Sequence, residues 1–285
     1  MKAQKEQSMR MIQGPLLPAI ISYTVPIILT SILQLLFNAA DLVIVGRWCG
    51  SVAVAAVGST GAITNLIVNL QNLFAQQNVG RAMRNSFATS LLQVFLSLAV
   101  SSIAGYGFEI YHDKYKDGVM AVIMLAMMVP FVAILVPLFQ MMSKAKLLNT
   151  WIGFFMPSLA TPFLIMYFRN SARTFPRDTI EAARIDGLNE FQIFVKMFVP
   201  MMQPTYASAA TITFMNAWNS YLWPKVIMQT ADATTMPMLV SNLMAGYVID
   251  YGVVMAGVTI CSLPTIIIFF CLQKSFTNAV AGAVK

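Results

Sequence analysis

Long uncharged stretches dominate this sequence and restrict what it can fold into. Seven of them, each at least 22 residues long, contain no Asp, Glu, Lys or Arg, and they run over residues 11–40, 48–80, 85–108, 118–143, 147–168, 197–224 and 251–273. An α-helix needs roughly 20 predominantly apolar residues to cross a bilayer. The pattern therefore predicts an all-α, polytopic transmembrane protein whose surroundings are the lipid bilayer.

The composition excludes several other classes of protein. Only 10% of the 285 residues are charged and 58% are hydrophobic, whereas about 25% of a soluble domain is charged. The formal net charge of +7 would suggest nucleic acid as the partner of a soluble protein. Here the basic residues lie between apolar stretches, where they set membrane topology, so we expect no nucleic-acid partner.

Motifs for covalent chemistry are absent from the sequence. It contains neither the phosphate-binding pattern G-x-x-x-x-G-K-[ST] nor the metal-binding pattern H-E-x-x-H, and each of these patterns places specific groups on a phosphate or a metal. We therefore predict that the chain is not an enzyme, has no catalytic residues, holds no metal and does not bind ATP by that route.

The longest charged segment between apolar stretches runs from Arg169 to Lys196. Within it, residues 178–196 have the apolar spacing of an amphipathic helix, which Pro176 precedes and Pro200 ends. Gly187 interrupts the pattern, and glycine is tolerated inside a helix where the chain bends or another backbone approaches closely. The segment therefore predicts a helix–bend–helix that another protein could bind.

The same segment carries a resemblance to a known family. The string TFPRDTIEAARIDGLNEFQIFVKMFVPMMQP, residues Thr174–Pro204, resembles the cytoplasmic EAA loop of ABC-importer permeases of the carbohydrate-uptake branch. FMNAWNSYLWP at Phe214–Pro224 is similar to the penultimate span of that branch, and Val253–Lys285 is similar to its last span and tail. RAMRNS at Arg81–Ser86 resembles the start of its second span, so the resemblance covers about residues 71–285.

The resemblance implies a five-span permease core in the bacterial cytoplasmic membrane, with the EAA coupling loop at 169–200. The loop would dock on an ABC ATPase subunit, and ATP would be bound by that partner, so this chain needs no cofactor. Further implied partners are a second permease subunit, an extracytoplasmic sugar-binding protein and a small carbohydrate substrate. The implied coupling residues are Glu181, Ala182, Ala183, Arg184, Asp186, Gly187 and Pro200. The small side chains of Ala182 and Ala183 would let the partner approach the helix closely.

Polar side chains also interrupt one apolar stretch. Asn216, Trp218, Asn219 and Tyr221 lie within a few residues of one another, and polar groups inside a membrane usually face a cavity or another helix. Amide and indole groups suit a sugar, so these four residues are candidates for the substrate pathway. The alternative is polar packing between helices.

Residues 1–70 resemble a different family. The segment Gly14–Leu70, and above all DLVIVGR at Asp41–Arg47, is similar to the first two spans of multidrug and toxin extrusion (MATE) transporters. The resemblance implies that only a fragment of such a transporter is present and that the permease part lacks its own first span, with the junction near Leu70–Gln71. Asp41 could then carry a coupling cation, or it could be an interfacial acid paired with Arg47.

The expected topology contains a conflict at this junction. With the 169–196 loop in the cytoplasm, inside loops carry nine Lys and Arg and outside loops three, in agreement with the positive-inside rule. A basic N-terminus in the cytoplasm then requires one span before the permease part, whereas the sequence offers two. The chain could be a fusion or mis-join of two genes, residues 50–70 could lie at the outer interface, or the N-terminus could be outside. The corresponding functional alternatives to a permease are a cation-coupled multidrug exporter fragment and a non-functional fusion.

Overall fold

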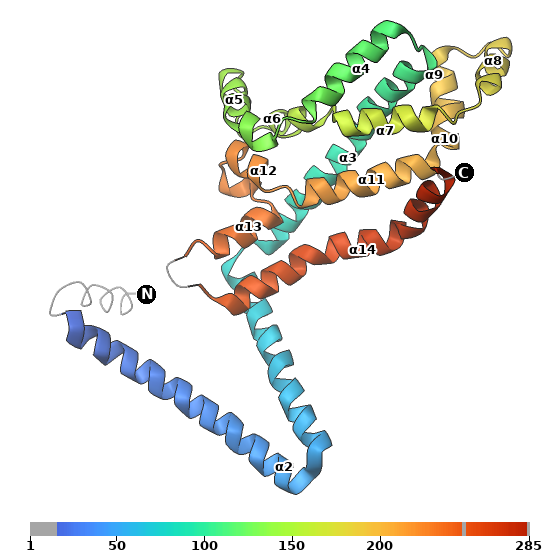
Figure 1. Cartoon of the computed structure of the whole chain (residues 1–285). Helices are drawn as coiled ribbons and strands as arrows, with labels where there is room; N and C mark the ends of the chain where they lie inside the picture. The colour runs from blue at the N-terminus through green and yellow to red at the C-terminus, as the bar shows by residue number, and fades with distance from the viewer. Residues whose placement is uncertain (1–15, 247–248, 284–285) are drawn as a thin grey trace. The chain divides into compact units, whose positions relative to one another are not determined.

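The structure is a computed structural model that describes residues 16–246 and 249–283. All regular structure in these two ranges is helical, which confirms the predicted all-α class (Figure 1). The elements are α2 (Leu16–Gln76), α3 (Val79–Ile110), α4 (Lys114–Ala126), α5 (Phe131–Lys144), α6 (Trp151–Phe155), η1 (Met156–Ser158), α7 (Pro162–Ala172), α8 (Arg177–Ile185), α9 (Glu190–Ile193), η2 (Phe194–Phe198), α10 (Val199–Met201), α11 (Gln203–Trp218), α12 (Leu222–Ile227), η3 (Ala231–Ala233), α13 (Met236–Leu243) and α14 (Tyr251–Ala283).

The chain divides into two compact units, Met1–Val68 and Asn69–Lys285. The described part of the first unit consists of helix α2, which continues into the second unit without a break. The sequence predicted two separate stretches here, and the structure assigns a single helix of 61 residues, about three times the length that a bilayer crossing requires. Its described apolar side chains, such as Phe37 and Trp48, are largely exposed, as expected of a helix covered by lipid.

The second unit is built around α3, which crosses the roughly parallel helices α7 and α11 (Figure 1). Gly105 lies at the crossing with α7, and a Cβ atom there would come within 2.6 Å of the Phe168 Cβ and 2.7 Å of the Arg169 backbone nitrogen. Only glycine lets the two backbones approach this closely. Leu98, Leu164, Phe168 and Ala209 form a buried cluster at the contacts of α3, α7 and α11.

The membrane-crossing elements are less regular than the sequence suggested. Among the described residues, Val79–Ile110 and Tyr251–Cys271 are long and apolar enough to span, and two bent helix pairs bring the total to as many as four. The predicted span over 118–143 is broken between α4 and α5, which meet at 101°. Pro130 precedes α5, and a proline disfavours helical conformation in the residue before it. The predicted span over 197–224 is also divided, and its main helix α11 has 16 residues.

Two apolar clusters mark opposite ends of this unit. At one end, the last turns of α3 pack with α8, α9 and η2 through Tyr106, Ile180, Ile193 and Phe198. At the other end, α5, α6 and α12 pack through Met142, Phe154, Trp223 and Ile227. The predicted loop over 225–250 lies toward that second end and contains the expected short helix, α13.

Candidate functional site

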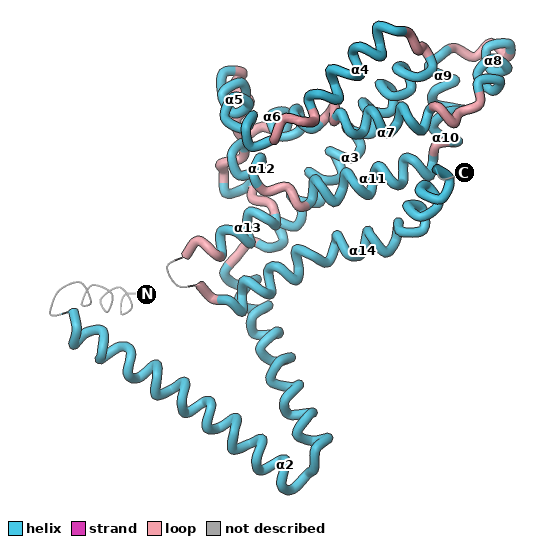
Figure 2. Tube along the Cα trace, in the orientation of Figure 1, coloured by secondary structure: helices cyan, strands magenta, loops and turns pink. Residues whose placement is uncertain are grey.

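The segment from Arg177 to Ile193, here called the elbow, is a helix–bend–helix as the sequence predicted (Figure 2). Helix α8 ends where Gly187 takes a φ of +77°, a conformation that favours glycine. The Leu188 N–H donates to the Ala183 carbonyl at 3.0 Å and the Gly187 N–H donates to the Arg184 carbonyl at 3.1 Å. These two hydrogen bonds form a Schellman motif that satisfies the last carbonyls of the helix.

Helix α9 begins with a capping box that fixes the second arm of the elbow. The Asn189 side chain accepts from the Gln192 N–H at 2.8 Å, and the Gln192 side chain accepts from the Asn189 N–H at 3.0 Å. Reciprocal bonds of this kind satisfy two of the free N–H groups at a helix start. Both arms are therefore held by local hydrogen bonds on either side of Gly187.

An ion pair closes the elbow across the bend. The Arg184 Nε donates to the Glu190 Oε1 at 2.8 Å, and this bond lowers the pKa of the Glu190 carboxyl. Tyr111 lies next to the end of α3, and the pKa of its phenol is raised by burial and by the nearby Glu190 carboxylate. The charged pair thus ties α8 and α9 together.

The elbow has an inward face and an outward face. Ile180 and Ala183 are 3% and 4% exposed and pack on Tyr106 and neighbouring rings, whereas Ile185 and Phe191 are 86% and 71% exposed. Of the two predicted contact alanines, only Ala182 is exposed; Ala183 faces the chain's own core. The exposed coupling candidates are Glu181, Ala182, Arg184, Asp186, Gly187 and Pro200.

Pro200 has a different position from the one expected. The sequence predicted that it ends the helix, but it lies inside the short turn α10, directly after the π-helical turn η2. A wider turn before a proline accommodates the backbone carbonyl that would otherwise lack its N–H partner. The helical run ends instead at Met202, before α11 begins.

Behind the elbow, a cluster of charges joins three helices. The buried guanidinium of Arg169 on α7 donates from Nε to the Glu109 Oε2 of α3 at 3.2 Å and from Nη2 to the Asp117 Oδ1 of α4 at 2.6 Å. Arg173 shares Glu109 at 3.3 Å, and His112 contacts Asp117 at 2.9 Å. We call Arg169, Glu109 and Asp117 the clamp; it links α3, α4 and α7 next to the elbow.

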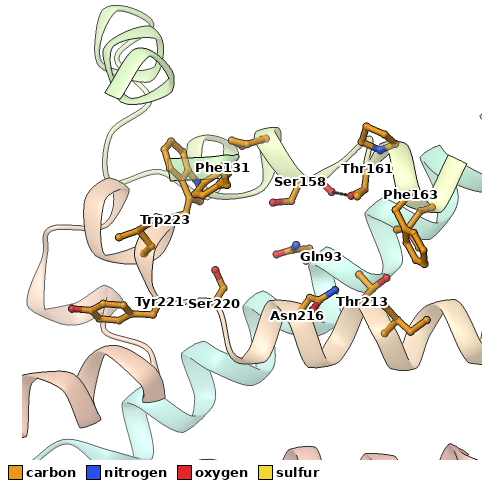
Figure 3. A pocket seen from close by; sticks show the side chains of 15 residues that line it. Gln93, Phe131, Ser158, Thr161, Phe163, Thr213, Asn216, Ser220, Tyr221 and Trp223 are labelled. Carbon is orange, nitrogen blue, oxygen red and sulfur yellow. Dashed lines mark hydrogen bonds between the residues drawn. The ribbon is translucent and has the colours of Figure 1, made fainter. Parts of the chain in front are cut away.

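A pocket of about 410 Å³ lies between α3, α7, α11 and the turn before α12 (Figure 3). It opens beside the 51° bend that separates the helical residues 151–158 from α7. Polar groups and aromatic rings share its lining: Gln93, Phe131, Pro157, Ser158, Thr161, Pro162, Phe163, Leu164, Ile212, Thr213, Asn216, Ser220, Tyr221, Leu222 and Trp223.

The four predicted pathway residues separate in the structure. Asn216 and Tyr221 line the pocket. Trp218 does not, because it is buried against Phe214 and its Nε1 donates to the Cys261 carbonyl at 2.8 Å. Asn219 also lies outside the lining, and its side-chain amide donates to the Met215 carbonyl of its own helix at 2.8 Å.

Sequence reasoning missed five polar lining residues, which are Gln93, Ser158, Thr161, Thr213 and Ser220. Gln93 had a usable signal, because it is an amide in the middle of an uncharged stretch, where polar groups usually face a cavity or another helix. Thr213 had a weaker one: it precedes Asn216 by three residues and so shares its helix face. The side chain of Asp41 lies outside the described part of the chain, so its cation-coupling role stays a prediction.

Comparisons with known proteins place this architecture. Residues 97–282 match the family described as binding-protein-dependent transport system inner membrane component. The lactose transport system permease protein LacG of Rhizobium radiobacter is 44% identical over 222 residues, which cover 78% of this chain and 81% of that protein. The arabinooligosaccharides transport system permease protein AraQ of Halalkalibacterium halodurans is 34% identical over 70% of this chain and 72% of that protein.

A solved structure gives the same fold. It is the crystal structure of a bacterial ABC transporter involved in the import of the acidic polysaccharide alginate, with a TM-score of 0.66 over 72% of this chain and 78% of that chain. At 19% sequence identity this likeness concerns the fold alone, whereas the family match covers well over half of the sequence. The chain therefore belongs to the binding-protein-dependent transport system inner membrane components, as a multi-pass protein of the cell membrane.

Proposed function

We propose that this chain is the permease subunit of an ATP-driven carbohydrate importer and that the elbow couples an ATPase subunit to alternating access. The elbow carries the proposal, because it presents exposed Ile185 and Phe191 from arms that hydrogen bonds and an ion pair hold in place. Exposed apolar side chains on a fixed support are typical of a protein-binding surface. Lactose and arabinooligosaccharides in the names of the relatives support carbohydrate as the substrate class.

The proposed assembly contains a second permease subunit, two ABC ATPase subunits or domains and an extracytoplasmic sugar-binding protein. The ATPase binds and hydrolyses ATP, so this chain needs no cofactor and performs no covalent chemistry. Movement of the elbow passes to α3 through Tyr111 and the Tyr106 cluster, and to α4 and α7 through the clamp. Interfaces that move as rigid bodies are one established way to convey such a change.

Substitution of Ile185 tests the docking role. Ile185→Glu places a charge on the exposed face, so we expect the ATPase subunits to be lost from the purified complex while the chain remains in the membrane. Ile185→Val keeps the surface apolar and is the matched control, with normal co-purification and sugar uptake. Normal uptake by the Ile185→Glu variant would contradict the proposal.

We also propose that residues 1–70 are a MATE-like fragment added to the permease rather than part of its transport machinery. The family match begins at residue 97, and the LacG match covers 78% of the chain. Sequencing the genomic reading frame across codons 65–80 tests the join. If residues 50–70 do not span and the elbow is cytoplasmic, a cysteine introduced at position 72 should react with a thiol label added outside the cell. Reaction only from the cytoplasm would contradict this topology.

A further inference from the structure

A second pocket, here called the groove, lies between the last turns of α3 and the first turns of α4. Helix α4 follows α3 after the turn at residues 111–113 (Figure 1). The groove has a volume of about 490 Å³, within the range of roughly 300–1,000 Å³ that is typical of small-molecule sites. It is separate from the pocket between α3, α7 and α11, with which it shares no lining residue.

The walls of the groove are apolar and open to the surroundings. Ile103 and Phe108 line it from α3 and Val119 lines it from α4, and Ile103 and Val119 are 54% and 51% exposed. Gly107 also lines it, and a Cβ atom added there would meet nothing within 4 Å. Because α3 is long and apolar enough to span a membrane, exposed apolar walls near its end are suited to lipid chains.

The polar end of the groove lies at the expected level of the membrane surface. Residues 109–117 separate the uncharged stretches 85–108 and 118–143, so the turn between α3 and α4 lies where the apolar region ends. Tyr111 and Lys116 line the groove at this turn. Tyrosine and lysine suit such an interface, because each combines an apolar body with a polar tip.

The carboxylates of this turn are engaged within the chain. Glu109 and Asp117 belong to the clamp and bond to Arg169. The Asp113 Oδ1 accepts from the backbone N–H groups of residues 115 and 116 at 2.8 and 2.9 Å, at the start of α4. Three acidic side chains in residues 109–117 therefore have partners of their own, and the cation that lines the groove is Lys116.

The ammonium of Lys116 retains donors for a further partner. Its Nζ donates to the Tyr111 carbonyl oxygen and lies 5.7 Å from the centre of the Tyr111 ring. The Asp113 Oδ2 is 3.4 Å from Nζ, longer than a charge-assisted hydrogen bond. An ammonium has three N–H groups, so an anionic group that enters from the groove can accept from one of them.

From these observations we infer that the groove binds an anionic phospholipid, with an acyl chain along Ile103, Phe108 and Val119 and with the phosphate on the Lys116 ammonium. A cytoplasmic elbow places the groove in the inner leaflet, where basic pockets between membrane helices suit anionic headgroups. The inference goes beyond the proposed function, because a lipid here contacts neither the elbow nor the pocket. Since the clamp residue Asp117 follows Lys116 directly, the lipid stabilises the same contact between α3 and α4 that the clamp holds.

Thermal stability in the presence of lipid tests the inference. The full-length chain is purified in detergent with the subunits that accompany it, and the midpoint of unfolding is measured as phosphatidylglycerol is added. A lipid that binds only the folded protein raises this midpoint. Phosphatidylcholine with the same acyl chains should require about fivefold more lipid for the same shift, because its cationic headgroup offsets the phosphate charge. Inorganic phosphate should leave the midpoint unchanged, since it cannot fill the apolar walls.

Two pairs of variants separate the headgroup from the acyl chain. Lys116→Gln should raise the phosphatidylglycerol concentration at half-maximal shift about tenfold. Lys114→Gln removes the same charge outside the groove and should raise it at most about twofold, because water and salt screen that charge. Gly107→Leu fills the groove and should abolish the shift by either lipid. Gly118→Leu is its matched control, since a Cβ atom there also meets nothing within 4 Å and Gly118 does not line the groove.

The outcomes also distinguish a lipid from a protein occupant. Lys116→Arg keeps the charge and should respond as the wild type does. Equal responses of the wild type to the two lipids would overturn the inference, as would equal effects of Lys116→Gln and Lys114→Gln or a full lipid response in Gly107→Leu. If Gly107→Leu instead removes a second permease subunit from the complex, that subunit covers the groove and the inference is wrong. Sugar uptake is not among these readouts, so none of these results decides the proposed function.

Discussion

Polar groups are paired where α3 and α7 end beside the elbow, and they are unpaired where the middle of α3 meets α11. At the inner ends, Glu109 and Arg169 are paired within the chain at 3.2 Å. In the middle, Gln93 on α3 and Thr213 on the adjoining α11 have no partner among the described residues. Paired charges thus fix helices to one another, whereas unpaired neutral groups remain free to form hydrogen bonds with a ligand.

Loss of the Arg169 guanidinium from the clamp should lower the stability of the protein more than any other change considered. Arg169→Leu leaves Glu109, which is 14% exposed, beside Arg173 alone. Breaking a buried ion pair costs about 3–5 kcal/mol, and we expect about 3 kcal/mol here because Asp117 is half exposed. The midpoint of thermal unfolding in detergent should fall accordingly. Arg173→Leu is the control: its side chain is 57% exposed, so little change is expected, and equal losses in the two variants would contradict the role of the clamp.

A substitution at Gly105, where α3 crosses α7, should cause the next largest loss of stability. In Gly105→Ala the new Cβ would lie 2.6 Å from the Phe168 Cβ and 2.9 Å from the Ile165 carbonyl oxygen, so we expect a loss of about 2 kcal/mol from overpacking. Gly107→Ala, two residues further along the same helix, meets nothing within 4 Å and should stabilise the helix by roughly 0.5–1 kcal/mol. Unfolding in a denaturing detergent compares the two, and similar shifts in both variants would show that α3 and α7 do not touch at Gly105.

Acid should have the smallest effect on the elbow, where a single exposed ion pair responds to it. The pKa of Glu190 is below its ordinary value because Arg184 bonds to the carboxylate. The ion pair therefore stabilises the elbow fully at a pH above the ordinary pKa of Glu. Its contribution is lost as the pH falls through the lowered pKa of the folded protein. The protection factors of the elbow amides in hydrogen exchange, which correct for the slower intrinsic exchange in acid, should therefore fall at the acidic end of a titration, below about pH 4. Arg184→Gln should remove most of this pH dependence because the pKa of Glu190 is then no longer held down by the guanidinium, and an unchanged transition would contradict the pairing. The neutral pocket has no comparable carboxylate and should not respond.

Local patterns in the sequence predicted the elbow well. Pro176 marked the start of α8, and Gly187 marked the bend, because a helix start and a left-handed turn are decided by a few neighbouring residues. Local patterns could not predict which charged residues far apart in the sequence form ion pairs. Arg169 contacts Glu109 and Asp117 across 60 and 52 residues of sequence, and nothing in the local pattern indicates which charges meet.

The pocket was predicted only in part for a related reason. The cluster from Asn216 to Tyr221 was visible, but Asn216 and Trp218 are two residues apart on α11 and so face opposite sides of that helix. Trp218 therefore packs in the core, while Asn216 reaches the pocket. The break of the 118–143 stretch follows from Pro130, whose effect on the backbone a hydropathy pattern does not register.

The close approach at Gly105 marks the point about which α3 and α7 would turn if the angle between them changed. Two helices whose backbones touch at one point can change their crossing angle there and still remain in contact. Along α3, the arm from Gly105 to Ile110 at the elbow end is about 8 Å, and the arm from Gly105 to Gln93 is about 18 Å, at 1.5 Å per residue. A rigid tilt of α3 about Gly105 would therefore move Gln93 about twice as far as Ile110, and in the opposite direction.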